Sequence, residues 1–405
     1  VCIACVLEQT WSCFRRKVAS KQVDISRTSV KMSGLGRYQV LAVVLAVLCL
    51  LPAHLDAQST STDSPHRRHF PRLTQGDITE ISEIINNLIE SNVIEDGTHP
   101  YIAGFVRLIF HDCVGVSCDG CVNLEYGPNA GLAPYIDVLN RTYYKPEHKL
   151  FKRMSQADLW ALAGIIAAGR GAAKGGEPLS TVFRYGRIDC STSPDTNAED
   201  VYPNANGGAR ETLDYWKDYF GFTYPETTAL LGAHSLGRCH RNASGFDGPW
   251  TTDKDSLDNA YFRDIANAEL GWRQEKLDSS HVQWVQSVGT DNMMLNSDMA
   301  LFKDLRPDTE DPAGQFSHCT YAQCGYSPSA AHVLAYAKDN ALFVRQFSSV
   351  FQKMIEHGYT TRAAGRDLYE PVPGEAYEGM PRAPKREVWE RAGPRARPYA
   401  PEGGV

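Results

Sequence analysis

The sequence lacks an apolar run long enough to cross a membrane, because a spanning helix needs about 20 apolar residues. The longest run, residues 40–51, is only about a dozen residues long. It follows Met32, the first methionine, and precedes Ala57, a small residue suited to cleavage. This pattern predicts a secretory signal over residues 32–57, and a membrane anchor is the alternative. We therefore expect a secreted, extracellular protein without a membrane span, and residues 1–31 to be upstream sequence outside the fold.

The sequence also lacks an excess of positive charge, which bears on the partners it can bind. It contains 41 Lys and Arg against 48 Asp and Glu, a formal charge of -7 at pH 7. Residues 1–57 hold seven of the basic and three of the acidic residues, so removing them changes the charge by -4, to -11. Nucleic-acid binding requires clustered Lys and Arg that neutralise phosphates. We expect no nucleic-acid partner.

A complete set of zinc ligands is missing as well. Cys113, Cys118 and Cys121 form a cluster, but no second C-x-x-C or histidine pair completes a zinc site. Seven cysteines follow residue 57, and in an oxidising compartment they should pair and leave one over. Proximity in the sequence favours two of the pairs. The expected disulfides are Cys113–Cys118, Cys319–Cys324 and, as a guess, Cys190–Cys239.

Strand-like alternation is scarce, and helical periodicity predominates. Ser155 is the predicted N-cap of a helix that ends near Gly169. Residues 171–208 are rich in Gly, Pro, Asn and Asp and predict a loop. The other predicted helices cover residues 77–94, 102–111, 209–220, 225–234, 257–269, 292–304 and 339–357. The pattern predicts a mostly helical body.

The two ends of the chain differ in composition from its middle. Residues 58–71 are rich in Ser, Thr, Pro, Arg and His and predict a flexible leader. Residues 363–405 contain Pro, Gly, Arg and Glu with few large apolar groups and predict a disordered tail. Between them, residues 72–362 are the predicted ordered domain. Its roughly 290 residues are enough to enclose a cofactor.

One histidine stands in a context that suits chemistry on a peroxide. Arg107 and His111 are four residues apart and therefore share one face of a helix. A neutral imidazole can move a proton between the two peroxide oxygens, and a guanidinium can stabilise the negative charge on the departing one. Phe110 would close this pocket against water. Alone the pattern is weak, and a hydrogen-bonded histidine at a helix end is the alternative.

A second histidine, His234, ends an apolar helical run. A proximal haem ligand is a histidine whose other ring nitrogen donates to a carboxylate. Asp298, in the helical pattern of residues 296–301, is the candidate carboxylate. An exposed helix residue is the alternative interpretation of Asp298.

Six segments occur in an order that resembles the plant-type haem peroxidase superfamily, over roughly residues 75–360. The likeness is greatest to its intracellular class, ascorbate peroxidase and cytochrome c peroxidase. The segments are residues 129–132 (NAGL), 158–164 (DLWALAG), 185–189 (YGRID), 231–237 (LGAHSLG), 244–251 (SGFDGPWT) and 296–301 (NSDMAL). The resemblance implies an all-α fold of about ten helices, in a distal and a proximal half with haem b between them. It also implies an enzyme that reduces hydrogen peroxide and oxidises a reductant in one-electron steps.

On the distal side, the resemblance makes His111 the acid–base group and Arg107 the charge stabiliser. It makes Asn129 the residue that fixes the tautomer of His111. The intracellular class has a tryptophan before the distal histidine, whereas Phe110 resembles the secreted classes of the superfamily.

On the proximal side, the resemblance makes His234 the axial ligand of the haem iron and Asp298 the acceptor of its ring N–H. Trp250 would stack beside His234. His240 matches a position that meets a haem propionate, and a surface histidine is the alternative.

The resemblance also suggests a distal calcium site after His111. Asp112 and Asp119 would supply carboxylates, and Gly115 and Ser117 would supply carbonyl oxygens, which suit a hard cation. The serine ligand of the family is replaced by Cys121, and a thiol or disulfide is a poor ligand for calcium.

A proximal cation site, for calcium or potassium, aligns with a second set of oxygen donors. Two carboxylates favour calcium by charge, and an acidic surface loop is the alternative. The set is Ser235, Thr251, Asp253, Ser256 and Asp258.

The reducing substrate and the oligomeric state stay open. The arginine that grips ascorbate in ascorbate peroxidases aligns with Ala243, and the matching lysine falls near His99. A phenol, ascorbate or a protein partner would all fit a haem peroxidase. A secreted haem-binding or matrix protein with little turnover is a second hypothesis, against which the complete residue set argues. A metal-thiolate or disulfide scaffold is a third, and the lack of a full ligand set makes it the weakest.

Overall fold

A computed structural model describes residues 70–114, 118–190, 202–311, 315–359 and 367–376. All of them belong to the unit formed by Ser64–Val405. The expected upstream sequence, the signal and most of the leader lie outside the described residues. Within the described part of the chain, no helix is both long and apolar enough to cross a membrane.

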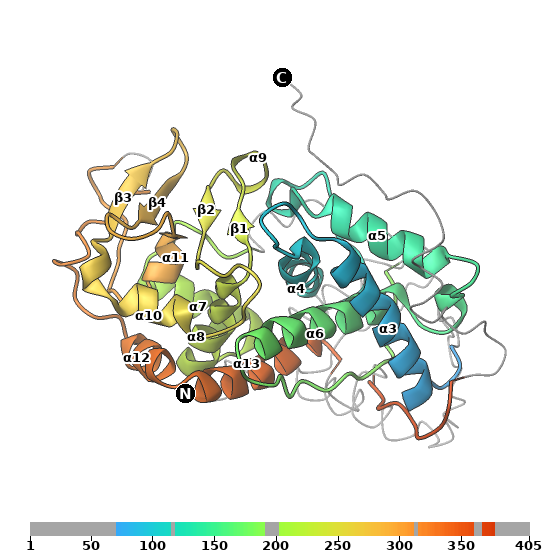
Figure 1. Cartoon of the computed structure of the whole chain (residues 1–405). Coiled ribbons are helices and arrows are strands. Elements are labelled where there is room, and N and C mark those ends of the chain that lie inside the picture. The colour runs from blue at the N-terminus through green and yellow to red at the C-terminus, as the bar shows by residue number, and fades with distance from the viewer. Residues whose placement is uncertain (1–69, 115–117, 191–201, 312–314, 360–366, 377–405) are drawn as a thin grey trace, which may run out of the picture. The chain divides into compact units, whose positions relative to one another are not determined.

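Helices dominate the described residues, which agrees with the predicted all-α class (Figure 1). Four short 3-10 helices accompany them, and these are η1 (Gly127–Asn129), η2 (Leu150–Lys152), η3 (Gly232–Ser235) and η4 (Ala268–Leu270). The eleven α-helices in the described ranges are α3 (Gln75–Ser91), α4 (Pro100–Cys113), α5 (Ala133–Tyr144), α6 (Gln156–Lys174), α7 (Ala209–Phe220), α8 (Tyr224–Leu231), α9 (Arg241–Ser244), α10 (Ala260–Ala266), α11 (Asn296–Met299), α12 (Ala330–Lys338) and α13 (Asn340–Ile355).

Five short strands form two small antiparallel sheets that the sequence pattern did not predict. One sheet pairs β1 (Arg238–Cys239) with β2 (Gly248–Pro249). The other has the order β3-β4-β5. Its strands are β3 (Arg273–Lys276), β4 (Val282–Val285) and β5 (Met293–Met294). Strands of two to four residues are too short to show the alternation by which strands are recognised.

Helix α6 packs against α4. The start of α6 was predicted correctly. The Ser155 hydroxyl accepts a hydrogen bond from the backbone N–H of Asp158 at 3.0 Å, which is the geometry of an N-cap. The helix continues past Gly169 to Lys174. A glycine inside a helix costs only about 1 kcal/mol, so Gly169 does not end this one.

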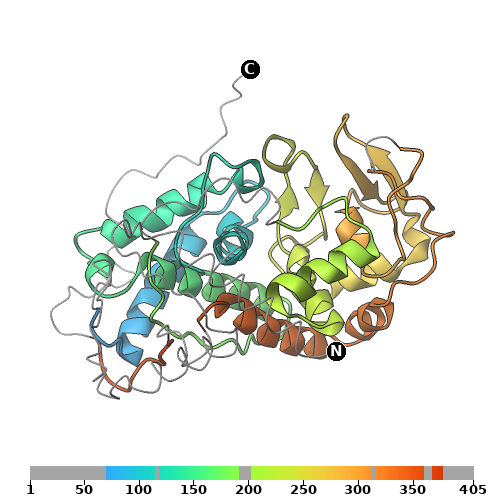
Figure 2. The ribbon, with the colours of Figure 1, turned by 180° about the vertical axis from the view of Figure 1, so that it is seen from behind.

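Close contact between α4 and α6 depends on a small residue. A Cβ atom added to Gly164 would lie 2.6 Å from Cγ2 of Ile109. This close approach holds α4, which carries Arg107 and His111, against the buried helix α6. Helix α13 adds a second support, since it contacts α4, α8 and α12. Both views show it running along the side of α6 that faces away from α4 (Figures 1 and 2).

The segment predicted as a helix over residues 292–304 is mostly different in the structure. It forms strand β5 and the single turn α11, followed by turns. Met293, Met294, Met299 and Leu301 are all completely buried. A segment buried on every side shows no periodicity that separates a strand from a helix. Helices α5 and α12 were not predicted at all.

Part of the predicted disordered tail has a defined place in the structure. Tyr369 forms an antiparallel bridge with Tyr185, and Val372 forms a parallel bridge with Thr74. Residues 367–376 therefore lie beside the start of α3 and the loop after α6. The rest of the predicted tail, residues 363–366 and 377–405, lies outside the described residues.

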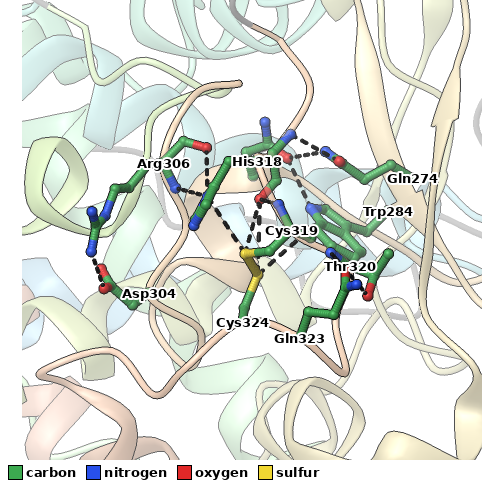
Figure 3. Close-up of a disulfide and its surroundings, with 11 residues drawn as sticks. Gln274, Trp284, Asp304, Arg306, His318, Cys319, Thr320, Gln323 and Cys324 are labelled. Carbon is green, nitrogen blue, oxygen red and sulfur yellow. Dashed lines mark hydrogen bonds and ion pairs between the residues drawn. A yellow bond between two sulfur atoms is a disulfide. The ribbon is translucent and has the colours of Figure 1, made fainter. Parts of the chain in front are cut away.

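Two of the three expected disulfides are confirmed, and the third is wrong. Cys113–Cys118 and Cys319–Cys324 are both formed, and Figure 3 shows the second beside His318. Cys190 pairs with Cys121 instead of Cys239, which is a buried free thiol. The backbone N–H of Cys190 donates to the carbonyl of Asp119 at 2.9 Å. This contact brings Cys190 to Cys121, and sequence distance could not reveal it.

Candidate functional site

The first histidine is held in one orientation by an amide. His111 Nδ1 lies 2.8 Å from Asn129 Oδ1, and Asn129 Nδ2 donates to the carbonyl of Asn123, also at 2.8 Å. Because an amide oxygen can only accept, Nδ1 of His111 carries the proton. Its Nε2 is therefore left with a lone pair that can accept a proton.

Arg107 lies one helical turn before His111 and ties α4 to the segment that carries Asn129. Its guanidinium donates to the carbonyl of Ala130 at 3.0 Å and to that of Pro128 at 2.9 Å. Burial lowers the pKa of Arg107, but a guanidinium stays charged in proteins. The structure therefore brings Arg107, His111 and Asn129 together, as the sequence predicted.

His111 is neutral at physiological pH. Its burial, and then the charge of Arg107, lower its pKa to about 3, against the opposing effect of the hydrogen bond that it donates to Asn129. A neutral histidine with a free Nε2 can act as a general base. A guanidinium beside it can stabilise an anion without competing for the proton.

Aromatic rings surround this histidine. The rings of Phe110 and His111 are 5.3 Å apart at 80°, and Trp216 lies 5.6 Å from Phe110. Tyr202 lies 4.9 Å from His111, and its hydroxyl donates to Asn129 Oδ1 at 2.8 Å. Tyr202 was not among the predicted residues, because it falls in a loop without periodicity.

The second histidine is held by a carboxylate. His234, on η3, places Nδ1 2.6 Å from Asp298 Oδ1, and Asp298 on α11 is completely buried. Trp250 donates from Nε1 to Asp298 Oδ2 at 2.8 Å, and its ring stacks on His234 at 4.3 Å and 19°. All three residues were predicted, and the structure brings them together.

Asp298 accepts two more hydrogen bonds that the sequence did not predict. The backbone N–H of Leu295 donates to Oδ2 at 2.8 Å, and the Tyr261 hydroxyl donates to Oδ1 at 2.7 Å. Burial raises the pKa of Asp298, but His234 and the other donors outweigh that effect and leave the pKa below its usual value. Asp298 is therefore an ionised carboxylate within the core.

The surroundings of His234 fit an axial ligand. Its side chain is 35% exposed although Asp298 is completely buried and Trp250 nearly so. Its Nδ1 is engaged with Asp298, so Nε2 is the nitrogen free to face an open space. An imidazole with one nitrogen bound to a carboxylate and the other free is the donor arrangement that a haem iron requires. His240, the predicted propionate contact, is exposed at the start of α9.

The predicted distal calcium site is only partly within the described residues. Asp112 is buried, and its Oδ1 accepts from the backbone N–H of Cys121 at 3.1 Å. Its Oδ2 has no hydrogen-bond partner among the described residues. Burial, and then the charge of Asp119, raise the pKa of Asp112 well above its usual value. A cation would relieve both features, but Gly115 and Ser117 lie outside the described residues, and the Cys121 sulfur is in a disulfide.

The predicted proximal cation donors are partly engaged with other groups. Ser235 is completely buried, and its hydroxyl lacks a partner in the described part of the chain. The Thr251 hydroxyl lies 2.8 Å from the Ser235 carbonyl and 3.2 Å from that of Asp253. Asp253 accepts from Lys174 at 2.7 Å and from the Ser256 hydroxyl at 2.9 Å. Lys174 thus already gives Asp253 a positive partner.

The last predicted donor of this set, Asp258, is engaged by the backbone. Its Oδ1 accepts from the N–H of Ala260 at 2.8 Å. Burial is the main cause that raises the pKa of Asp258. The five residues lie near one another, but the structure contains competing partners for several of them.

Comparisons with known proteins agree with this geometry. The sequence model of the family described as "Peroxidase" matches residues 83–312. A mitochondrial cytochrome c peroxidase of Yarrowia lipolytica is 28% identical over 316 residues, which cover 75% of this chain and 81% of the relative. A mitochondrial cytochrome c peroxidase of Candida albicans is 30% identical over 298 residues, 70% of each chain. A putative heme-binding peroxidase of Gibberella zeae is 26% identical over 320 residues, 76% of this chain and 87% of the relative.

The expectation of a secreted, extracellular protein is wrong by this comparison. Several of the similar proteins are named as mitochondrial. The expectation depended on an apolar run after a basic residue, and targeting segments of more than one kind combine basic and apolar residues. Residues 32–57, which carry that pattern, lie outside the described residues.

Proposed function

This chain belongs to the plant-type haem peroxidase superfamily and is a haem peroxidase, and from that premise we propose which of its residues perform the reaction. The proposal rests on the observation that the chain holds two histidines in a fixed orientation, each through a hydrogen bond from Nδ1 to a side-chain oxygen. The oxygen belongs to an amide at His111 and to a carboxylate at His234. This difference assigns proton transfer to His111 and metal binding to His234.

His234 would hold the haem iron through Nε2. Haem b held there would supply the iron at which hydrogen peroxide is reduced and a reductant is oxidised in one-electron steps. Asp298 orients the imidazole and gives it anionic character. Trp250 stacks on one face of His234, and we assign His240 to a haem propionate because it is exposed at the start of α9.

His111, Arg107 and Asn129 are the proposed catalytic group. As the O–O bond of the peroxide breaks, His111 Nε2 would take the proton from one peroxide oxygen and give it to the other, which leaves as water. The bound haem would supply the two electrons. Arg107 stabilises the negative charge on the leaving oxygen. Asn129 keeps the proton of the imidazole on Nδ1, and Phe110 covers one side of the pocket.

A bound cation at the distal site is part of the proposal. Oδ2 of buried Asp112, which has no partner among the described residues, supports it, together with the nearby carboxylate of Asp119. The Ser235 hydroxyl, also without a partner in the described ranges, supports a proximal cation, calcium or potassium, whereas the contact between Lys174 and Asp253 argues for a weaker site. Calcium chelation followed by metal analysis tests for calcium at either site, and dialysis into potassium-free buffer tests for potassium at the proximal one. A loss of thermal stability on removal of the cation is the expected result.

The reductant is proposed by chemical class. The names of the relatives favour cytochrome c, and ascorbate and phenols are the small-molecule alternatives. His99 is held by Asp255 through both its backbone N–H and Nδ1, so it is not a free cation that could grip ascorbate. We therefore place ascorbate last of the three.

A mitochondrial location is the one that the names of the relatives favour. The three disulfides among the described residues favour a compartment in which thiols are oxidised. Fractionation of mitochondria with an antibody to this chain tests the location, and signal confined to another fraction would contradict it.

The test of the function is stopped-flow absorbance of the haem-loaded chain mixed with hydrogen peroxide, beside His111→Leu. A fast spectral change that is lost in the variant is expected, with a rate loss of about 10²- to 10⁴-fold. Ferrocytochrome c, a phenol and ascorbate are then compared as reductants in the same cell. Haem binding without a fast reaction would instead favour a haem-binding protein with little turnover.

A further inference from the structure

Tyr261 is a residue of the proximal site to which the proposed function assigns no role. It is completely buried on α10, and its hydroxyl donates to Asp298 Oδ1 at 2.7 Å. His234 Nδ1 uses the same oxygen at 2.6 Å. The rings of Tyr261 and His234 are 6.3 Å apart at 81°. The two donors therefore compete for one acceptor.

The carboxylate of Asp298 is fully used by its four donors. Oδ1 accepts from His234 and Tyr261, while Oδ2 accepts from Trp250 and Leu295. A carboxylate that accepts more hydrogen bonds is a weaker base, because each bond stabilises its charged form. A weaker base draws less on the Nδ1 proton of His234, so the imidazole keeps less negative charge.

We infer that Tyr261 is a positioning residue that limits the charge Asp298 passes to His234 and so raises the reduction potential of an iron bound there. The inference rests on the proposed ligation by His234. An anionic imidazole stabilises ferric iron, and hydrogen bonds around an axial ligand set the potential. Asp298 lowers the potential by making the imidazole more anionic, and the hydroxyl of Tyr261, which donates to the same Oδ1, raises it by weakening that effect.

Filling of the core does not account for the hydroxyl. Phe262, the next residue, is also completely buried without one, and a phenylalanine at 261 would fill almost the same volume. Asp298 Oδ1 would still be satisfied by His234, so the carboxylate does not need the phenol. Most buried hydroxyls have a hydrogen-bond partner, and the partner of this one is the same oxygen that accepts from His234.

The test is a spectroelectrochemical titration of the ferric/ferrous couple in the haem-loaded full chain and in Tyr261→Phe. The variant should favour the ferric form by up to about tenfold, a fall in potential of no more than about 59 mV for one electron. The iron–histidine stretching frequency of the ferrous form should rise with it. An unchanged or higher potential would overturn the inference.

Two further variants test whether a change in potential is due to the hydroxyl of Tyr261. Tyr336→Phe removes another buried hydroxyl, which donates to the Pro225 carbonyl at 3.0 Å, and should leave the potential unchanged. 3-Fluorotyrosine at position 261 keeps the ring and makes the hydroxyl a stronger donor, so the potential should rise. A change of the same sign in the phenylalanine and fluorotyrosine variants would contradict the inference.

A last variant separates this inference from the proposed function. His234→Ala should lose the axial ligand and change the haem spectrum. If it does so while Tyr261→Phe leaves the potential unchanged, the inference about Tyr261 alone is wrong. If His234→Ala leaves the spectrum unchanged, the ligand assignment fails.

Discussion

The two histidine sites share one hydrogen bond, from Nδ1 to a side-chain oxygen, but differ in the charge of the acceptor. In each, Nδ1 meets a side-chain oxygen, at 2.8 Å in His111 and at 2.6 Å in His234. The acceptor at His111 is a neutral amide with Arg107 nearby, whereas the acceptor at His234 is an ionised carboxylate. The first arrangement keeps the imidazole neutral, and the second gives it anionic character. In the proposed function, the charge of the neighbours therefore decides which imidazole moves protons and which binds the metal.

The comparison extends to the tyrosines. Tyr202 shares the amide oxygen with His111, and Tyr261 shares the carboxylate oxygen with His234. In both sites a tyrosine hydroxyl donates to the same oxygen that accepts from the histidine. The sites thus differ in charge and agree in layout, and each of the following changes alters one of these two properties.

Removal of the distal positive charge should have the largest effect. Arg107→Leu should slow the reaction with hydrogen peroxide by about 10²- to 10³-fold, because the charge on the leaving oxygen loses its stabiliser. Stopped-flow rate constants at several peroxide concentrations measure it. Arg210→Leu, whose side chain is 96% exposed, is the matched control and should be unaffected. A rate close to that of the unmodified enzyme would show that Arg107 holds only the loop around Asn129.

Asp298→Asn makes the proximal site resemble the distal one. It should lower haem affinity or activity by about 10- to 100-fold, as loss of such a partner does, and raise the reduction potential. The amide has an NH2 group in place of one carboxylate oxygen, and this group would face donors that need an acceptor. The substitution should therefore also lower the free energy of unfolding by about 1–3 kcal/mol. A titration of the potential and thermal unfolding measure the two effects. An unchanged potential would contradict the role of the carboxylate.

Asn129→Asp makes the reverse exchange and should appear in the pH profile. His111 must be neutral to accept a proton, and its pKa of about 3 keeps it so through the usual range. A carboxylate beside Nδ1 favours the charged form and should raise that pKa by about 1–3 units. The rate of the peroxide reaction should then fall at a higher pH than in the unmodified enzyme. A variant whose acid limb stays near pH 3 would show that this acceptor does not control His111.

The fold and the site were not equally predictable from the sequence. Arg107 and His111 follow from helical spacing, and Asn129, His234, Trp250 and Asp298 follow from the order of the resembling segments. Tyr202 lies in an irregular loop, where no period points to a function. Tyr261 is an aromatic residue among apolar ones, which is the ordinary pattern of a core.

Contacts between distant segments explain both omissions. Tyr261 and Asp298 are 37 residues apart, and Tyr202 and Asn129 are 73 apart. Neither distance corresponds to a repeat of a helix or a strand, so only packing brings the groups together. The same reason accounts for the disulfide between Cys121 and Cys190.

Removal of the Tyr202 hydroxyl should have the smallest effect on the reaction. It is best measured in the Asn129→Asp variant, in which the rate should fall at a pH high enough to measure. We expect Tyr202→Phe, added to Asn129→Asp, to raise the pKa of His111 further by less than about one unit. The remaining acceptor oxygen would then serve His111 alone, and one hydrogen bond contributes about 0.5–1.5 kcal/mol, where one pKa unit is about 1.4 kcal/mol. Tyr321→Phe in the same background is the control, because its hydroxyl donates to the Ile265 carbonyl and it should leave the limb in place. If Tyr202→Phe moved the limb to lower pH, Tyr202 would strengthen the hold of the acceptor on His111, and the two tyrosines would not act alike.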